Sequence, residues 1–128
     1  MARQPKPRPL EGKRILIAED EYLVAQDLQR TLEGAGGIVV GAAPTIRSSN
    51  HLADEVPLDG AIVNLKLTDG SGLRVLEHLR LLKVPFIVLS GFPRSQVPQA
   101  LRDAPFIGKP YANDDLIALA ARHFGGAA

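Results

Sequence analysis

Five short apolar runs, each followed by a segment with helical periodicity or a turn, constrain the fold of this chain more than any other feature. The runs lie at residues 14–18, 38–42, 60–65, 85–90 and 105–107, and they are rich in Val, Ile and Leu. Strands that are apolar at consecutive positions are typical of parallel sheets, in which both faces are buried. Regular alternation of strands and helices therefore predicts an open, doubly wound α/β domain with a parallel sheet.

The intervening segments define the expected helices and the order of the strands. Helices are predicted at 21–34, 45–55, 73–82 and 112–124, and at most a short helix at 95–101. Residues 69–72 predict a turn, in which Ser71 could cap the helix that follows. Right-handed crossovers predict strand order 2-1-3-4-5, with a crevice at the carboxyl ends of the strands.

The length and composition predict one domain with a basic arm. The chain has 128 residues, 45% of them hydrophobic, which is enough for a single core at residues 13–124. Residues 1–12 contain three prolines and residues 1–14 contain five basic residues against one acid, so we expect an extended, flexible arm. Residues 125–128 are a short tail. The arm has no aromatic residues and the remainder is acidic, so DNA is not an expected partner.

Several classes of protein are excluded by what the sequence does not contain. No apolar run is long enough to span a membrane, and the N-terminus has no secretory signal pattern. Without cysteine, disulfides and thiolate metal sites are excluded. We expect a cytoplasmic, bacterial-type protein that does not bind membranes. His51, His78 and His123 are scattered without ligand spacing, so we expect no histidine metal site.

Adjacent carboxylates close the first apolar run, at Glu19, Asp20 and Glu21. Negative charges this close repel one another unless something offsets them. A Mg²⁺ ion, which binds one or two carboxylates together with water, is the usual remedy. The alternative is that Asp20 caps the next helix and that the two glutamates are solvated.

A polar residue also stands at the carboxyl end of three other expected strands. These residues are Asn64, Ser90 and Lys109. Each has a local alternative: a turn residue, a serine bonded to nearby backbone, and a surface lysine. Because the ends of parallel strands meet at one edge of the sheet, the joint pattern favours a shared functional site.

With these features, the chain resembles the receiver domains of two-component response regulators, over residues 12–124. The matching segments are RILIAEDE, IVNLKLTDGSGLRVLEHL, PFIVLSG and PFIGKPY. The third is similar to a subgroup with the pattern PFxxxTG(Y/F), with Ser90 in place of threonine. The resemblance implies a flavodoxin-like (βα)5 fold. It also implies a signalling module rather than an enzyme.

The resemblance also implies roles for individual residues. Glu19 and Asp20 match the acidic pair that holds Mg²⁺, with the backbone carbonyl of Lys66 as a further ligand. Ser90 and Lys109 match the residues that bind the phosphoryl group, and the Lys109–Pro110 bond matches one that is usually cis. Phe106 takes the place of the switch aromatic, although it could equally be a core or interface phenylalanine.

The main departure from the family is Asn64, which stands at the position of the phospho-acceptor aspartate. A carboxamide is a poor nucleophile and cannot form an acyl phosphate, so we expect no normal phosphorylation of this chain. As a metal ligand, Asn64 lacks the charge of aspartate, so Mg²⁺ binding should be weakened. The substitution could be natural, as in a pseudo-receiver, or an engineered Asp-to-Asn change.

Two functions remain open. The first is a single-domain response regulator in a phosphorelay, bound by a sensor histidine kinase or histidine phosphotransferase. The second is a phosphorylation-independent adaptor. A homodimer could form through residues 95–101, 105–107 and 112–124.

Three other classes of function are disfavoured. The acidic run after the first strand would repel phosphate, which argues against a flavodoxin-like cofactor binder. No residues remain for a helix-turn-helix, which argues against a DNA-binding regulator. A metal-dependent hydrolase would need a nucleophile or base where Asn64 stands.

Overall fold

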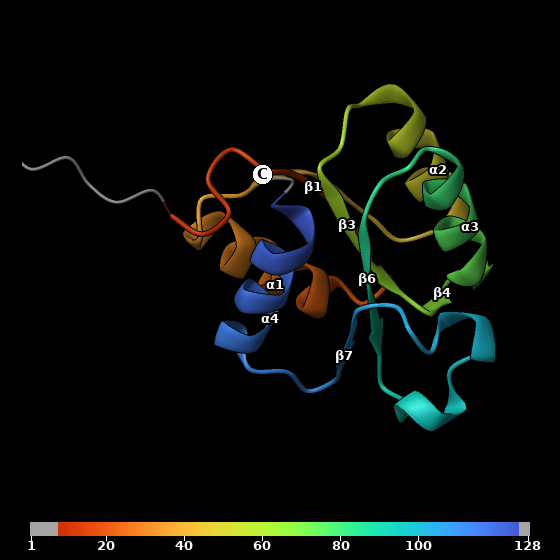
Figure 1. The fold of residues 1–128 in the computed structure, drawn as a ribbon. Helices are drawn as coiled ribbons and strands as arrows, with labels where there is room; N and C mark the ends of the chain where they lie inside the picture. The colour runs from red at the N-terminus through yellow and green to blue at the C-terminus, as the bar shows by residue number, and fades with distance from the viewer. Residues whose placement is uncertain (1–7, 126–128) are drawn as a thin grey trace, which may run out of the picture.

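The computed structural model describes residues 8–125 and has a five-stranded parallel sheet at its centre (Figure 1). In spatial order, the strands are β2 (Ile38–Ala43), β1 (Arg14–Ala18), β3 (Gly60–Asn64), β6 (Phe86–Ser90) and β7 (Phe106–Gly108). Every neighbouring pair is parallel. Counted along the chain, these five strands have the predicted order 2-1-3-4-5, and the flavodoxin-like fold is confirmed.

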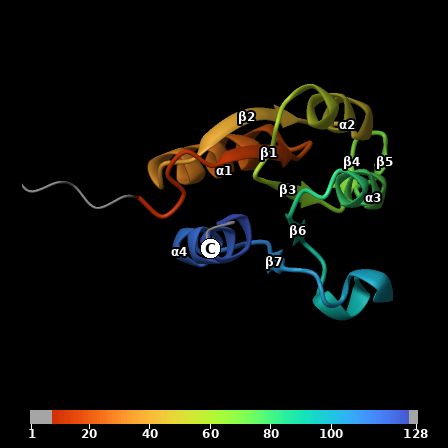
Figure 2. The ribbon, with the colours of Figure 1, turned by 45° about the horizontal axis from the view of Figure 1, so that its top comes forward.

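Helices cover both faces of the sheet (Figures 1 and 2). The helices α1 (Tyr22–Gly34) and α4 (Asn113–Phe124) lie on one face, and α2 (Ile46–Glu55) and α3 (Leu73–Leu81) lie on the other. Successive residues of a strand point to opposite faces. In β1, Ile15 and Ile17 pack toward α1 and α4, whereas Leu16 and Ala18 pack toward α2 and α3. The continuous apolar runs therefore serve two cores at once.

Two connections between the strands bear on the prediction, one in agreement with it and one different from it. Segment 95–101 holds two short 3₁₀ turns, η1 (Arg94–Gln96) and η2 (Gln99–Leu101), which agrees with at most a reduced helix. The expected turn after β3 contains a small antiparallel ribbon of β4 (Lys66–Leu67) and β5 (Gly70–Ser71). Strands of two residues are too short to show a hydrophobic period, so the sequence did not reveal them.

The predicted flexible arm at residues 1–12 is too long. Residues 1–7 lie outside the described residues, but residues 8–12 belong to the folded domain. Leu10 is fully buried, and its backbone N–H donates to the carbonyl of Ala35 at 2.8 Å. Lys13 Nζ donates to the carbonyl of Gly125 at 2.8 Å, which ties the two ends of the domain together. The high proline and charge content of this segment indicated an extended arm, although the single apolar residue Leu10 anchors it.

Within residues 8–125, no helix combines the length and the apolar character that crossing a membrane would require.

The start of α2 is capped from two directions. Thr45 and Ser48 form a local capping box, in which the Thr45 hydroxyl accepts from the Ser48 N–H at 2.9 Å. Asp69, from the loop between β4 and β5, accepts from the N–H groups of Ile46 at 2.6 Å and Arg47 at 3.3 Å. These backbone hydrogen bonds, led by that of Ile46, hold the pKa of the Asp69 carboxyl below its usual range. The carboxylate also suits the positive end of the helix.

We predict that Asp69→Asn lowers the free energy of unfolding at neutral pH, because the amide carries no charge. The pKa of Asp69 is lower in the folded state than in the unfolded state, so its carboxylate stabilises the folded domain. This contribution is complete above the unfolded-state pKa and is lost as pH falls through the folded-state pKa. Urea unfolding at a series of pH values should therefore show the two proteins converging in acid. Asp103→Asn, at an exposed acid, is the matched control. A difference for Asp69→Asn that stays constant down to low pH would contradict the prediction.

Gly72 allows α3 to begin directly beside the end of β3. A Cβ atom at Gly72 would collide with the backbone carbonyl oxygen of Asn64, which cannot move aside as a flexible side chain could. The Gly72 N–H donates to the carbonyl of Leu65 at 2.8 Å and fixes this close approach. The absence of a side chain at Gly72 thus helps to position Asn64.

We predict that Gly72→Ala lowers the free energy of unfolding by about 1–3 kcal/mol, the usual cost of overpacking a tight site. Chemical denaturation would measure this change. Gly34→Ala is the control, because a Cβ atom there meets nothing within 4 Å and alanine favours a helix. Equal stability of the two variants would show that the contact at Gly72 relaxes at no cost.

Candidate functional site

A hollow of about 270 Å³ lies at the carboxyl ends of the central strands. Its lining comprises Asp20, Glu21, Asn64, Leu65, Lys66, Ser90, Gly91, Phe92 and Lys109. Glu19 contacts three of these residues, Glu21, Asn64 and Lys109, but is itself only 2% exposed. The structure thus brings together all the residues predicted at the strand ends. Phe106 does not line the hollow.

Glu19 is the most buried acid of the site. The N–H of Glu21 donates to Glu19 Oε2 at 3.1 Å, so the carboxylate closes the turn that leads into α1. The Lys109 ammonium lies 2.7 Å from Oε1, close enough for an ion pair but without the directionality of a hydrogen bond. Burial raises the pKa of the Glu19 carboxyl, although Lys109 and the Glu21 N–H act in the opposite direction.

Asn64, the last residue of β3, is 4% exposed and faces the acidic side of the hollow. Its Nδ2 donates to Glu19 Oε2 at 3.0 Å and to the backbone carbonyl of Lys66 at 2.7 Å. Asp20 Oδ1 lies 3.5 Å from the same nitrogen. Turning the amide around would place its oxygen against these three oxygens, so the hydrogen bonds determine its orientation.

Lys109 follows β7 and reaches across the hollow to α1. Besides the ion pair with Glu19, its ammonium lies 3.4 Å from Glu21 Oε1. Its backbone N–H donates to the carbonyl of Ser90 at 2.8 Å, which continues the pairing of β6 with β7. The Lys109–Pro110 bond is cis, as the resemblance implied. Glu21, which one interpretation of the sequence left as a solvated residue, is therefore a second partner of this lysine.

Ser90 combines a local contact with a place in the hollow. Its Oγ accepts from the N–H of Phe92 at 2.9 Å, which is the local alternative considered from the sequence. The side chain is nevertheless part of the lining and is 1% exposed. Phe92 itself, 58% exposed, flanks the hollow and was not singled out from the sequence.

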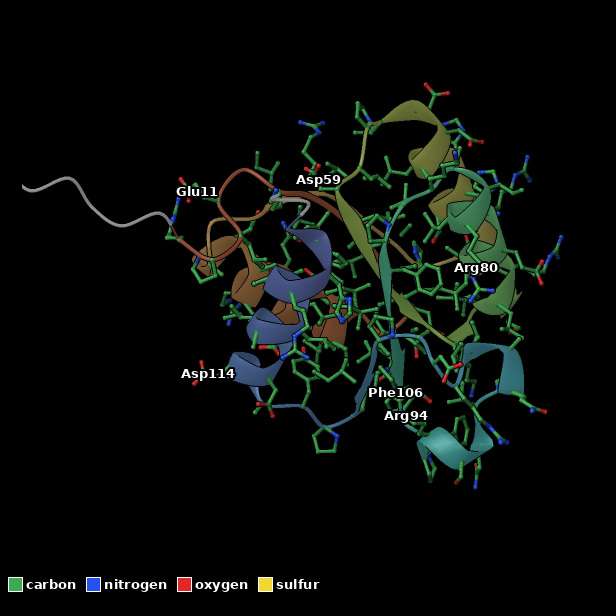
Figure 3. All side chains as sticks on the ribbon, viewed as in Figure 1. Glu11, Asp59, Arg80, Arg94, Phe106 and Asp114 are labelled. Carbon is green, nitrogen blue, oxygen red and sulfur yellow. The ribbon has the colours of Figure 1, made fainter. Side chains whose placement is uncertain are left out.

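Phe106 lies on β7 under the side chain of Arg94 (Figure 3). The guanidinium carbon is 4.8 Å from the ring centroid, a cation–π distance. Arg94 also donates to the backbone carbonyl of Arg102 and so braces the two 3₁₀ turns. Nothing in the sequence indicated this contact, because the segment has no regular period.

Only part of the expected metal site fits Mg²⁺. Carboxylate oxygens of Glu19, Asp20 and Glu21 lie within 4.8 Å of one another, and oxygen is the donor that Mg²⁺ prefers. Asn64, however, turns its nitrogen toward Glu19 Oε2 and the Lys66 carbonyl, and an amide N–H group is a donor of hydrogen bonds rather than a metal ligand. The expectation that Asn64 binds the metal therefore does not fit this arrangement.

We predict that Lys109→Met destabilises the domain by about 2 kcal/mol or more at neutral pH, because a buried carboxylate loses the one cation paired with it among residues 8–125. Protonation of Glu19 removes the unpaired charge, so the loss should shrink in acid. Thermal unfolding at neutral and acidic pH would measure both effects. Lys66→Met is the control, since the exposed Lys66 contributes its backbone carbonyl and not its ammonium. Equal losses at the two pH values would exclude this account.

The comparisons with known proteins agree with the geometry. The family model described as "Response regulator receiver domain" matches residues 15–121. The chain is 38% identical to the phyllosphere-induced regulator PhyR of Methylorubrum extorquens, over 76% of this chain and 38% of that protein. It is 30% identical to the transcriptional regulatory protein PdtaR of Mycobacterium tuberculosis, over 82% of this chain and 53% of that protein.

A solved structure shows the same relationship. The response regulator PhyR from Brucella abortus superposes with a TM-score of 0.80 at 29% identity, over 91% of this chain and 50% of that chain. The chain thus spans about half or less of the relatives that it matches. The match of the family model covers most of the domain, including the strand ends that form the hollow. The chain therefore belongs to the response regulator receiver domain family.

Proposed function

We propose that this receiver domain acts by binding a sensor histidine kinase or a histidine phosphotransferase and does not itself accept a phosphoryl group. The observation that carries the proposal is Asn64, placed at the end of β3 inside the hollow with Ser90 and Lys109. Phosphoryl transfer to this position would need a carboxylate oxygen to attack phosphorus. The amide nitrogen of Asn64 is a poor nucleophile and is engaged as a donor.

The groups around Asn64 support a site derived from phosphoryl chemistry. Catalysis of phosphoryl transfer depends mostly on positioning and on neutralising charge. The ammonium of Lys109 and the hydroxyl of Ser90 belong to the same hollow and could contact phosphoryl oxygens. In this proposal, the chain keeps these residues and the acids Glu19 and Asp20 of the family's site, but lacks the aspartate that accepts the phosphoryl group. The proposal includes weak Mg²⁺ binding and no enzymatic activity of the chain alone.

A partner could also use the surface around Phe106. This surface comprises the two 3₁₀ turns, β7 and α4, and a second copy of the chain could bind there. Part of the proposal is that signalling occurs in the cytoplasm, between proteins and without DNA or membrane. Because the chain spans only part of its relatives, any further activity of a longer protein is a separate matter.

Two histories of Asn64 make different predictions. If Asn64 replaced aspartate in an otherwise working site, as in an engineered form, the reverse change should restore phosphorylation. If the chain is a phosphorylation-independent adaptor, the rest of the site need not be competent. The retained ion pair between Lys109 and Glu19 supports a site whose remaining groups could still serve phosphoryl transfer.

We predict that Asn64→Asp gains a phosphoryl group when it is incubated with a small phosphodonor and Mg²⁺, whereas the unsubstituted chain does not. Intact-mass analysis would detect the adduct. The double variant Asn64→Asp with Lys109→Met is the control, and it should react more slowly because the cation is lost. An adduct on the unsubstituted chain would overturn the proposal, and no adduct on Asn64→Asp would favour the adaptor.

A further inference from the structure

The side-chain nitrogen of Asn64 lies at a place where three oxygens converge from two separate parts of the chain. The oxygens are Glu19 Oε2 at 3.0 Å, the Lys66 carbonyl at 2.7 Å and Asp20 Oδ1 at 3.5 Å. Two of these distances are those of ordinary hydrogen bonds, and an amide nitrogen has two hydrogens to donate. The third contact is longer and is electrostatic in character.

These three oxygens are the ones that the family resemblance assigned to Mg²⁺. In this chain they surround the partial positive charge of an N–H₂ group instead. Asn64 and Glu19 are nearly inaccessible, at 4% and 2% exposure, so water cannot easily replace either partner. A cation entering here would have to displace the amide and leave its buried donors unsatisfied.

The site also holds a cation and hydrogen-bond donors that offset part of its negative charge without a metal ion. Glu19, Asp20 and Glu21 contribute three negative charges, and Lys109 contributes one positive charge, at 2.7 Å from Glu19 and 3.4 Å from Glu21. The N–H dipoles of Asn64 and the N–H of Glu21 offset part of the remaining negative charge. These groups already stabilise part of the negative charge that a divalent ion would neutralise, which reduces the benefit of binding one.

We propose that the Asn64 amide replaces a divalent cation, so that the site keeps its arrangement without Mg²⁺. The amide joins the end of β1, through Glu19, to the loop after β3, through the Lys66 carbonyl. These are two segments that a shared metal ion would otherwise connect. The domain is thereby held in one arrangement whatever the Mg²⁺ concentration.

This inference rests on the proposed function, in which Asn64 is the residue of a binding-only site. The two can nevertheless fail separately. The mass experiment above tests whether a phosphoryl group is transferred, whereas the following experiment tests only whether a cation binds. An unsubstituted chain that binds the cation as tightly as Asn64→Asp, but is not phosphorylated, would overturn the present inference and leave the proposed function standing.

The test compares the unsubstituted chain with Asn64→Asp and Asn64→Ala. Thermal unfolding is measured in EDTA and in millimolar MgCl₂, with NaCl added to match the ionic strength. We expect the melting temperature of the unsubstituted chain to be the same in both. For Asn64→Asp, whose third carboxylate repels the other two, we expect a lower melting temperature in EDTA and a rise of about 4 °C or more with Mg²⁺. Asn64→Ala, which lacks the amide, should also gain stability from Mg²⁺.

A titration with Mn²⁺ alone, followed by the loss of the free-ion electron paramagnetic resonance signal, provides a readout that does not depend on stability. Asn64→Asp should bind Mn²⁺ roughly 10–100-fold more tightly than the unsubstituted chain. Equal affinity of the two proteins would overturn the inference, as would a rise in melting temperature of the unsubstituted chain that matches the rise of Asn64→Asp. Failure of both variants to respond to Mg²⁺ would overturn it as well.

Discussion

The contact between the buried carboxylate of Glu19 and the ammonium of Lys109 is the interaction on which the site depends. It joins the end of β1 to the end of β7, which lie on either side of β3 and β6. A carboxylate with only 2% exposure is tolerable because this ammonium, the Asn64 amide and the Glu21 N–H surround it. The remaining polar residues of the hollow are arranged around that network.

The parallel sheet explains why the network can form. All five strands point their carboxyl ends to the same edge, so residues separated by up to 90 positions in the chain can meet there. The two cores hold this edge in place, since every residue of β3 and β6 is buried. Close packing at Gly72 and the cap that Asp69 provides for α2 fix the loop that carries the Lys66 carbonyl. Stability and site geometry therefore depend on the same loop.

In this network, asparagine in place of aspartate at position 64 does more than remove a nucleophile. Aspartate at position 64 would add a third negative charge beside Glu19 and Asp20, and a cation would be needed to hold them together. Asparagine has nearly the same shape but presents hydrogen-bond donors to the same oxygens. In our proposal, this receiver is thus organised by hydrogen bonds where a phosphorylated receiver would use charge and metal. A module of this kind suits signalling by binding.

The sequence by itself determined the fold class, the strand order and the set of residues at the strand ends, because hydrophobic period and the rules of parallel sheets are local or topological properties. The tertiary structure alone decided the partners of those residues. Glu21 contacts Lys109, Leu10 anchors a segment expected to be flexible, and Arg94 covers Phe106, all through contacts distant in the chain or outside any periodic pattern. The direction of the Asn64 amide was likewise not readable from the sequence. It follows from which oxygens surround it, and only the folded chain brings those oxygens together.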